Sequence, residues 1–336
     1  DGLAEFVAGA PDYDSLPRGA AFVFSAADGS FVCELLDPGA EGKFGASIAH
    51  VADVDRDLVP DIAVGAPYGG GGVRLFSGAD CSPLTSFHDP EGGSGLGHAV
   101  ASLDDVSGDG VPEIVATAFG SRRLVIFSGA DGSVIARASD PEAVYGDEFG
   151  HALIAIGDLN DDGFPEIVAG IPGDDTPGEE GAGSVVVFSG ADRTILRRIV
   201  EPEVQAGSRF GHSLAALDDL DGDGVPEIAV GAPDRDSVHA SDVGAAYVFS
   251  GADGTLVDLL SDPFARPGRR FGSAVAALGS RRIGVGAGAQ GWAQVLVYAD
   301  DLTLRRYLEH VEWSAGVHAI VGLGDINGDG VLDVAG

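Results

Sequence analysis

Basic residues are scarce in this chain. It has 19 Lys and Arg against 53 Asp and Glu, which gives a formal net charge of −34 at pH 7. Nucleic-acid backbones and anionic membrane surfaces are themselves negative, so this charge excludes them as partners and favours cations. No apolar run approaches the roughly 20 residues that a membrane-spanning helix needs. The sequence therefore predicts no nucleic-acid partner and no membrane insertion within this segment.

Methionine is absent, and there are only two cysteines, Cys33 and Cys81. Two cysteines do not form a zinc-ligand cluster, and the sequence leaves open whether they pair in a disulfide between neighbouring repeats. Glycine and proline are abundant, with 53 and 17 residues in the chain. This balance suits short strands joined by tight turns and disfavours long helices, so it predicts an all-β fold.

An aromatic or aliphatic residue followed by glycine recurs through the chain at spacings of 52, 53, 61 and 61 residues. The pairs are Phe44-Gly45, Leu96-Gly97, Phe149-Gly150, Phe210-Gly211 and Phe271-Gly272. Each pair opens an apolar stretch, which is followed by an acidic loop and then by two strand-like segments. An Asp-containing turn then leads to a last apolar stretch. Four strands per repeat is the content of a β-propeller blade.

The repeat divides residues 1–336 into units of approximately 1–43, 44–95, 96–148, 149–209, 210–270, 271–315 and 316–336. The first and last units are incomplete, because the chain opens in the middle of a repeat and its last unit supplies only two strands. We predict a single β-propeller domain with seven blade positions, with six as the alternative count. The incomplete terminal blades also predict that the chain is a fragment of a longer protein.

Five acidic loops carry oxygen side chains at loop positions one, three, five and nine. They comprise Asp53, Asp55, Asp57 and Asp61; Asp105, Ser107, Asp109 and Glu113; Asp158, Asn160, Asp162 and Glu166; Asp219, Asp221, Asp223 and Glu227; and Asp325, Asn327, Asp329 and Asp333. Oxygen-only ligands at alternate positions of a tight loop favour calcium over soft metals. We predict four or five calcium ions with a structural role.

Glycine at position six lets four of these loops turn sharply, so that the next carbonyl can also face the ion. The expected carbonyl donors are Val111, Phe164, Val225 and Val331. Leu58 occupies position six of the first loop, which is therefore the weakest candidate. The alternative is that the loops are Asp-rich turns without an ion. An EF-hand is excluded, because position twelve lies in a strand-like segment and carries no Glu.

Together, the Phe-Gly pairs, the acidic loops and the Gly-Ala-Pro endings at residues 65–67 and 231–233 resemble the FG-GAP repeat of integrin α-subunit propellers and related bacterial proteins. The resemblance implies a secreted or cell-surface protein whose metal loops lie on one face of the propeller. It places binding of a protein or glycan ligand on the opposite face. The corresponding loops here are residues 173–184 and 234–244, with shorter companions at 12–19 and 68–72.

No catalytic motif stands out in the sequence. The glycine pattern at residues 286–291 is followed by a strand-like segment where a phosphate-binding helix would be required. His98, His151 and His212 follow the glycine of their repeats and are interpreted as structural. We predict a non-enzymatic, adhesion-type binding module. The alternatives are a propeller attached to, or part of, a secreted hydrolase such as a phospholipase, and a structural spacer on a bacterial surface.

Overall fold

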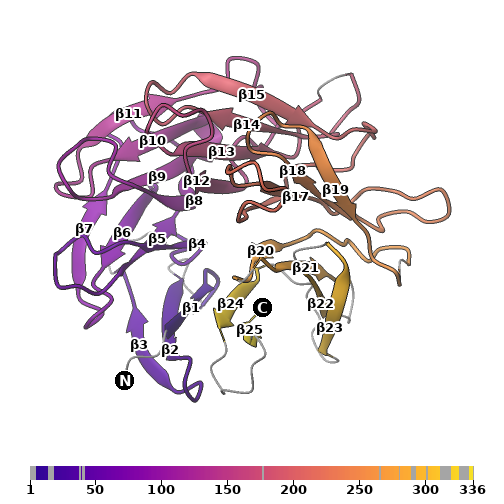
Figure 1. Cartoon of the computed structure of the whole chain (residues 1–336). Coiled ribbons are helices and arrows are strands. Elements are labelled where there is room, and N and C mark those ends of the chain that lie inside the picture. Colours follow the sequence, from indigo (N-terminus) through magenta and orange to yellow (C-terminus); the bar gives the residue numbers. More distant parts are fainter. Residues whose placement is uncertain are drawn as a thin grey trace. The chain divides into compact units, whose positions relative to one another are not determined.

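The protein is all-β, as a computed structural model shows. The structure describes residues 5–13, 19–37, 39, 42–175, 178–264, 266–279, 281–288, 293–299, 302–310, 319–324 and 333–335. These residues form 25 strands and one short 3₁₀ helix, Phe119–Ser121. Among the described residues, no helix is long and apolar enough to span a membrane. The prediction of an all-β chain of antiparallel four-stranded blades is confirmed (Figure 1).

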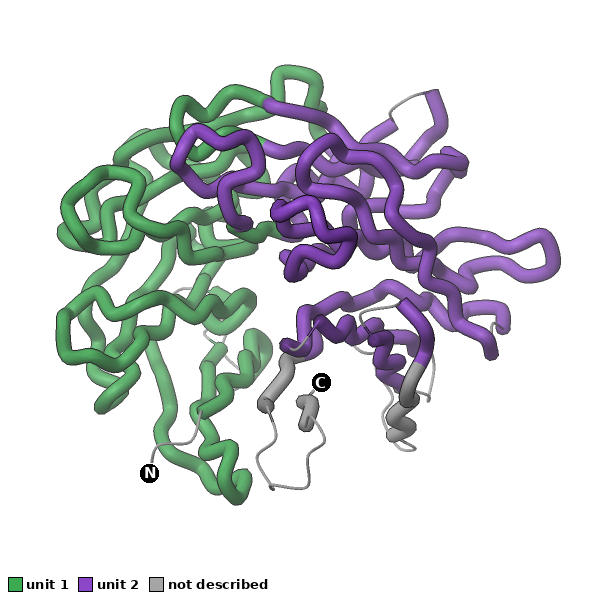
Figure 2. The backbone as a smooth tube through the Cα atoms, in the orientation of Figure 1, with its two compact units in different colours: residues 1–145, 153–155, 188–195 green, residues 146–152, 156–187, 196–336 purple. Residues whose placement is uncertain are grey.

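The chain forms two compact units, drawn in different colours in Figure 2. The first comprises residues 1–145, 153–155 and 188–195, and the second comprises residues 146–152, 156–187 and 196–336. The first unit contains three consecutive antiparallel sheets. Their strands are β1 (Glu5–Ala10), β2 (Ala20–Ser25) and β3 (Phe31–Leu35); β4 (Ser47–Val51), β5 (Asp61–Ala66), β6 (Gly72–Phe76) and β7 (Pro83–Phe87); and β8 (Leu96–Leu103), β9 (Glu113–Ala118), β10 (Arg123–Phe127) and β11 (Val134–Ala138).

Three more four-stranded sheets and one short sheet follow along the chain. Their strands are β12 (Leu153–Ile156), β13 (Glu166–Ile171), β14 (Ser184–Phe188) and β15 (Ile195–Val200); β16 (Ser213–Ala216), β17 (Ile228–Ala232), β18 (Ala245–Phe249) and β19 (Leu256–Leu260); β20 (Val275–Ala277), β21 (Ile283–Ala287), β22 (Ala293–Tyr298) and β23 (Leu304–His310); and β24 (Val321–Gly324) with β25 (Asp333–Ala335). In each complete sheet, sequence order is strand order.

The expected seven blade positions are wrong, and the protein has six blades. In the described residues, five sheets have four strands, the N-terminal sheet has β1, β2 and β3, and β24 pairs with β25 in a two-stranded sheet. The repeat count gave one blade to each incomplete end. However, the N-terminal sheet has three strands and the described part of the C-terminal sheet has two, so neither end forms a four-stranded blade of its own.

The repeated glycines mark places where two backbones meet. A Cβ atom on Gly65 in β5 would lie 2.1 Å from the carbonyl oxygen of Gly97, which belongs to the next sheet. Gly97 itself has a φ of 88°, a conformation that side chains strongly disfavour. The same contact recurs in three further pairs, Gly9 with Gly45, Gly170 with Gly211, and Gly231 with Gly272. Glycine at both positions therefore allows neighbouring sheets to approach closely enough to bury their apolar side chains.

The core consists of apolar side chains between adjacent sheets. Phe44, Phe149, Phe210 and Phe271, each from a Phe-Gly pair, are at most 1% exposed. The ring of Phe44 packs edge-on against Phe76, with 6.0 Å between the ring centroids. Burial of one such side chain stabilises the fold by about 1.5–3 kcal/mol, so these positions anchor the repeat.

A disulfide joins Cys33 in β3 to Cys81 in the turn between β6 and β7. It links the first and second sheets. The two cysteines therefore do pair between neighbouring repeats, which the sequence left open. Both cysteines pack against the apolar cluster between these sheets.

Candidate metal centre

Four of the five predicted acidic loops lie in the described part of the chain, and each connects the first strand of a sheet to the second. They are residues 53–61 before β5, 105–113 before β9, 158–166 before β13 and 219–227 before β17. The fifth predicted loop lies outside the described side chains. It comprises Asp325, Asn327, Asp329, Val331 and Asp333.

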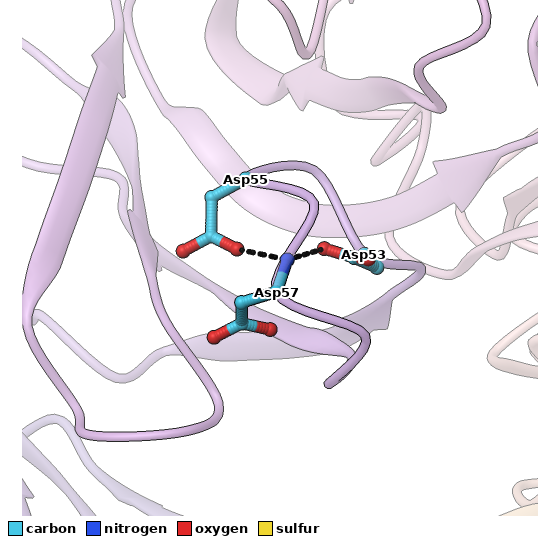
Figure 3. Close-up of side chains that lie close together, drawn as sticks. All are labelled: Asp53, Asp55 and Asp57. Carbon is cyan, nitrogen blue, oxygen red and sulfur yellow. Dashed lines mark hydrogen bonds between the residues drawn. The ribbon is translucent and has the colours of Figure 1, made fainter.

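The first Asp of each loop holds the turn together by accepting backbone hydrogen bonds. In the first loop, the Asp53 carboxylate accepts from the N–H groups of Arg56, Asp57 and Leu58 at 2.6, 3.0 and 2.8 Å. Figure 3 shows Asp53, Asp55 and Asp57 around the same turn, with the Asp57 N–H directed to oxygens of the other two. These hydrogen bonds from consecutive N–H groups to side-chain oxygens fix the shape of the turn.

The other three loops repeat this arrangement. The carboxylates of Asp105, Asp158 and Asp219 accept from the N–H of the glycine at position six at 2.8, 2.7 and 3.0 Å. The fifth residue accepts from the N–H of the seventh, at 2.8 Å in the Asp109–Val111 pair. In Asp105, the hydrogen bond from Gly110 is the main reason why the carboxyl pKa is below its usual range. One hydrogen-bond pattern thus shapes four separate loops.

The ninth residue of each loop is buried beneath the turn. Asp61, Glu113, Glu166 and Glu227 are each 0% exposed. One oxygen of each accepts from the N–H of position two, as in the Glu227–Leu220 bond of 2.7 Å. Burial raises the pKa of all four carboxyls, in Glu166 to about 7. An ionised carboxylate here lacks sufficient compensation from the protein alone.

Glu166 has the least compensation. Its Oε2 accepts from the Leu159 N–H at 2.5 Å, whereas its Oε1 is buried and has no hydrogen-bond partner. Ligand oxygens of Glu166, Asp158 and Asp162 lie within 4.8 Å of one another. A buried oxygen without a donor, on a carboxylate that lies close to two others, fits a bound cation.

The structure brings together most of the predicted carboxylates. The groups whose ligand atoms lie within 4.8 Å of one another are Asp53, Asp55 and Asp57; Asp105, Asp109 and Glu113; Asp158, Asp162 and Glu166; and Asp219, Asp221 and Glu227. Asp61 and Asp223 are not in these groups. Asp61 instead accepts from the N–H groups of Val54 and Gly78 at 2.8 and 3.2 Å. Asn160 lies in its loop and donates to the Asp162 carboxylate at 3.0 Å, while Ser107 donates to Asp105 at 3.3 Å.

Leu58 does not prevent the first loop from adopting the shared conformation. Its φ is 73°, and position six of the other three loops is glycine with φ between 82° and 89°. Arg56 also has a left-handed φ of 70°. Each such residue costs roughly 1–2 kcal/mol relative to an ordinary conformation, so this loop stores strain that its carboxylate hydrogen bonds offset.

In the unit that opens at Phe271, a short turn takes the place of an acidic loop. Residues 278–282 connect β20 to β21, and the Leu278 N–H donates to the Arg282 carbonyl at 2.9 Å. The Arg281 guanidinium donates to the carbonyl of Leu220, a residue of the loop 219–227, at 2.9 Å. The unit that opens at Phe271 therefore places the positive side chain of Arg281 beside the acidic loop 219–227 of the preceding unit.

Sequence reasoning missed a second set of acidic residues. An acidic residue followed by proline precedes each Phe-Gly or Leu-Gly pair; the set is Asp37, Asp89, Asp140, Glu201 and Asp262. The side chain of Asp89 is fully buried and forms ion pairs with two arginines. Its Oδ2 lies 2.5 Å from Nη2 of Arg123, and its Oδ1 lies 2.5 Å from Nη2 of Arg137. Arg74, Arg235 and Arg269 pair with Asp37, Glu201 and Asp262. The recurrence of acid-proline pairs was the available signal. Asp37, Asp89, Glu201 and Asp262 are ion-pair partners of arginines.

The histidines after the repeat glycines make packing contacts. The ring of His98 lies 4.4 Å from that of Phe119, and the rings of His151 and His212 lie 4.6 Å apart. The loops expected to bind a ligand are ordered by their own hydrogen bonds in their described parts. Asp175 accepts from the Gly181 N–H at 2.9 Å, and Asp236 accepts from the Asp242 N–H at 2.8 Å.

Comparison with known proteins supports the resemblance seen in the sequence. The model of the FG-GAP repeat family matches residues 150–188 and 210–249. Integrin alpha-5 of Xenopus laevis is 30% identical over 219 residues, which cover 57% of this chain and 20% of the relative. Human phosphatidylinositol-glycan-specific phospholipase D is 39% identical over 105 residues, covering 28% of this chain and 12% of the relative.

The chain thus spans about a fifth or less of these curated relatives. Among solved structures, the WD40 repeats of RRP9 match with a TM-score of 0.60 at 13% identity, covering 96% of this chain and 84% of that one. At this identity, the likeness supports the propeller fold alone.

Proposed function

We propose that this chain, an integrin-α-like propeller of FG-GAP repeats, is a calcium-stabilised extracellular module that binds a protein or glycan and does not itself catalyse a reaction. The observation that carries the proposal is the shared loop architecture. Four described loops place acidic side chains around one turn with a buried carboxyl beneath it, and Glu166 has a buried oxygen without a donor. The chemistry of these donors is that of a calcium site.

The residues proposed to hold calcium are those of loop positions one, three, five and nine, with the carbonyls of Val111, Phe164 and Val225 as additional donors. The fifth loop, with Val331 as its carbonyl donor, is included in the proposal. Bound calcium would supply positive charge that offsets carboxylate repulsion and the burial of the ninth residue. At a free calcium concentration about one hundred times the dissociation constant, each site would stabilise the fold by roughly 2.7 kcal/mol.

The proposed recognition surface lies at the opposite ends of the same strands. In β13, Glu166 begins the strand beside its acidic loop, and Ile171 ends it next to residues 173–184. In the same way, β17 separates the loop 219–227 from residues 234–244. Val238 is 96% exposed within 234–244, so an apolar side chain is available for a partner.

A second candidate is a propeller module that accompanies a hydrolase. It is favoured by the 39% identity to phosphatidylinositol-glycan-specific phospholipase D. Two observations test this candidate: the activity of the purified chain on a phosphatidylinositol-glycan substrate, and the domains that share its polypeptide. Hydrolysis by this chain would reject the non-enzymatic reading, and a hydrolase domain in the same polypeptide would favour the accessory role.

The decisive experiment is a calorimetric calcium titration of the chelator-stripped chain, with magnesium as the competing ion and thermal unfolding followed in parallel. We expect four or five calcium ions and a clear rise in Tm. Asp158→Ala should remove one ion, whereas Glu203→Ala, a matched change at a side chain that is 87% exposed, should remove none. Absence of binding at millimolar calcium would reject the metal role.

The recognition role needs a separate measurement. The calcium-loaded chain is applied to arrays of extracellular proteins and of glycans. Binding that is reduced by changes in residues 234–244 supports the proposed surface. If neither array retains the chain, the binding-module proposal is wrong even when calcium binds.

A further inference from the structure

A small pocket lies at the end of β5 that is remote from the acidic loop 53–61. Its volume is about 270 Å³, and its lining includes Asp37, Tyr68, Arg74, His88 and the glycines 69–72. These residues all belong to the first compact unit. The pocket volume is near the lower limit for ligand sites, so it suits one small ring and not an extended ligand.

The pocket exists because glycines surround it. Gly69, Gly70 and Gly71 have φ values of 68°, 120° and 68°, which side-chain-bearing residues disfavour. A Cβ on Gly70 would meet nothing within 4 Å, so packing is not what requires glycine there. A Cβ on Gly72 would lie 3.0 Å from the His88 ring, and one on Gly39 would lie 3.4 Å from the Asp37 carboxylate. Larger residues at Gly39 or Gly72 would therefore narrow the pocket.

The corresponding connection in the next sheet is more crowded. There, the 3₁₀ helix Phe119–Ser121 connects β9 to β10, and the Phe119 ring packs against His98. A Cβ on Gly120 would lie 2.1 Å from the hydroxyl oxygen of Ser94. Gly42 stands at the position of Ser94 in the second sheet, so the side chain that crowds Gly120 has no counterpart beside the pocket.

The charged groups of the pocket are already paired. The Arg74 guanidinium donates to both Asp37 oxygens, with Nε–Oδ2 and Nη2–Oδ1 distances of 2.6 and 3.1 Å. Lys43, beside the pocket, lies 3.5 Å from Asp12 and 5.8 Å from the centroid of the Tyr68 ring. The positive charges of Arg74 and Lys43 are therefore already neutralised, and the chain has a net charge of −34. Both facts disfavour an anionic ligand in this pocket.

Tyr68 is 60% exposed and provides an aromatic wall. The C–H groups of a sugar ring pack on such a surface, because the aromatic face is electron-rich. The Arg74–Asp37 pair adds both donors and acceptors, which hydroxyl groups can use together. His88 contributes an imidazole, whose Nδ1 lies 3.3 Å from the Gly71 carbonyl oxygen.

We propose that this pocket binds a single neutral sugar residue of a glycan, with Tyr68 as the stacking platform and the Arg74–Asp37 pair as the hydroxyl-binding group. The inference rests on the proposed function, since it names the ligand class of the surface opposite the calcium loops. It assigns glycan and not peptide recognition to this part of the chain.

The test is saturation-transfer NMR on the full, calcium-loaded chain, with D-glucose, D-galactose, D-mannose and N-acetyl-D-glucosamine offered separately. We expect at least one sugar to receive saturation. Tyr68→Ala should weaken binding roughly tenfold, as expected from loss of one aromatic contact. Gly39→Leu should abolish binding by filling the pocket, since Gly39 has an ordinary φ and the variant should fold. Tyr145→Ala is the control, because Tyr145 is 90% exposed and does not line the pocket.

The inference is overturned if no sugar in the panel receives saturation, if transfer persists in both pocket variants, or if the Tyr145→Ala control loses it equally. Binding of an acidic peptide that depends on Arg74 would also overturn it. Failure of the pocket remains distinguishable from failure of the proposed function. A chain that binds calcium and is retained on a protein or glycan array independently of Tyr68 keeps the function and loses the pocket.

Discussion

Glu166→Gln should stabilise the metal-free protein and reduce the further stabilisation that calcium adds. The Glu166 carboxyl is fully buried, one of its oxygens lacks a donor, and burial raises its pKa from 4.5 to about 7. A carboxyl with a raised pKa leaves folding unpenalised below pH 4.5, and the penalty grows between pH 4.5 and pH 7. At pH 8 the penalty is nearly complete, at roughly 3 kcal/mol.

Glutamine has the same shape without the charge. Its carbonyl can accept from the Leu159 N–H, and its amide can donate towards the carboxylates of Asp158 and Asp162, which lie within the same 4.8 Å group. We therefore expect the variant to raise the free energy of unfolding of the chelator-treated protein at pH 8. Loss of an anionic ligand should weaken calcium binding at this loop at least tenfold, and each tenfold removes roughly 1.4 kcal/mol of calcium-induced stabilisation.

The assay is urea unfolding at pH 8 with chelator and with calcium, and again at pH 5 with chelator. At pH 5 the stabilising effect should largely disappear, because the wild-type carboxyl is then mostly protonated in the folded state. Glu203→Gln is the matched control, at a side chain that is 87% exposed. A Glu166→Gln protein that is less stable than wild type without metal, or that keeps the full calcium response, would refute the reasoning.

Three further changes test other parts of the structure. Leu58→Gly should stabilise the metal-free chain by up to about 1 kcal/mol, because the relief of left-handed strain exceeds the entropy that glycine adds to the unfolded state. The control Leu256→Gly in β19 should destabilise the chain, and the midpoints of urea unfolding compare the two variants. Asp89→Asn removes the buried charge between two arginines and should lower the free energy of unfolding by about 3–5 kcal/mol, so an unchanged midpoint would contradict the ion-pair assignment. Changing Cys33 and Cys81 together to serine opens a crosslink of sequence separation 48 and should cost about 4 kcal/mol, and reduction of the wild type should match it.

The acidic loops were predictable because their pattern is local and repeated. Alternating side chains, such as those of Asp105, Ser107 and Asp109, lie within one turn whatever the rest of the fold does. The burial of Glu166 was not predictable in the same way, since it depends on packing beneath the loop. The arginine partners of Asp89 were missed because Arg123 and Arg137 lie 34 and 48 residues away, and no local pattern links them to it.

The blade count failed for a related reason. The repeat fixes what each segment is, and β1 and β24 are recognisable as a second and a first strand, respectively. It does not fix how many blades the two incomplete ends form. That number depends on which strands associate at the ends, a long-range choice that leaves no periodic trace in the sequence.

The glycines show most clearly which features a sequence can reveal. Gly65 and Gly97 are required wherever two sheets meet, because a Cβ on Gly65 would lie 2.1 Å from the Gly97 carbonyl oxygen. Since this contact recurs from sheet to sheet, it appears as a repeated motif. Gly70 is glycine without such a neighbour, and it occurs where one pocket is open. Its positive φ serves a local turn and not a contact between sheets, so no repeated motif could have predicted it.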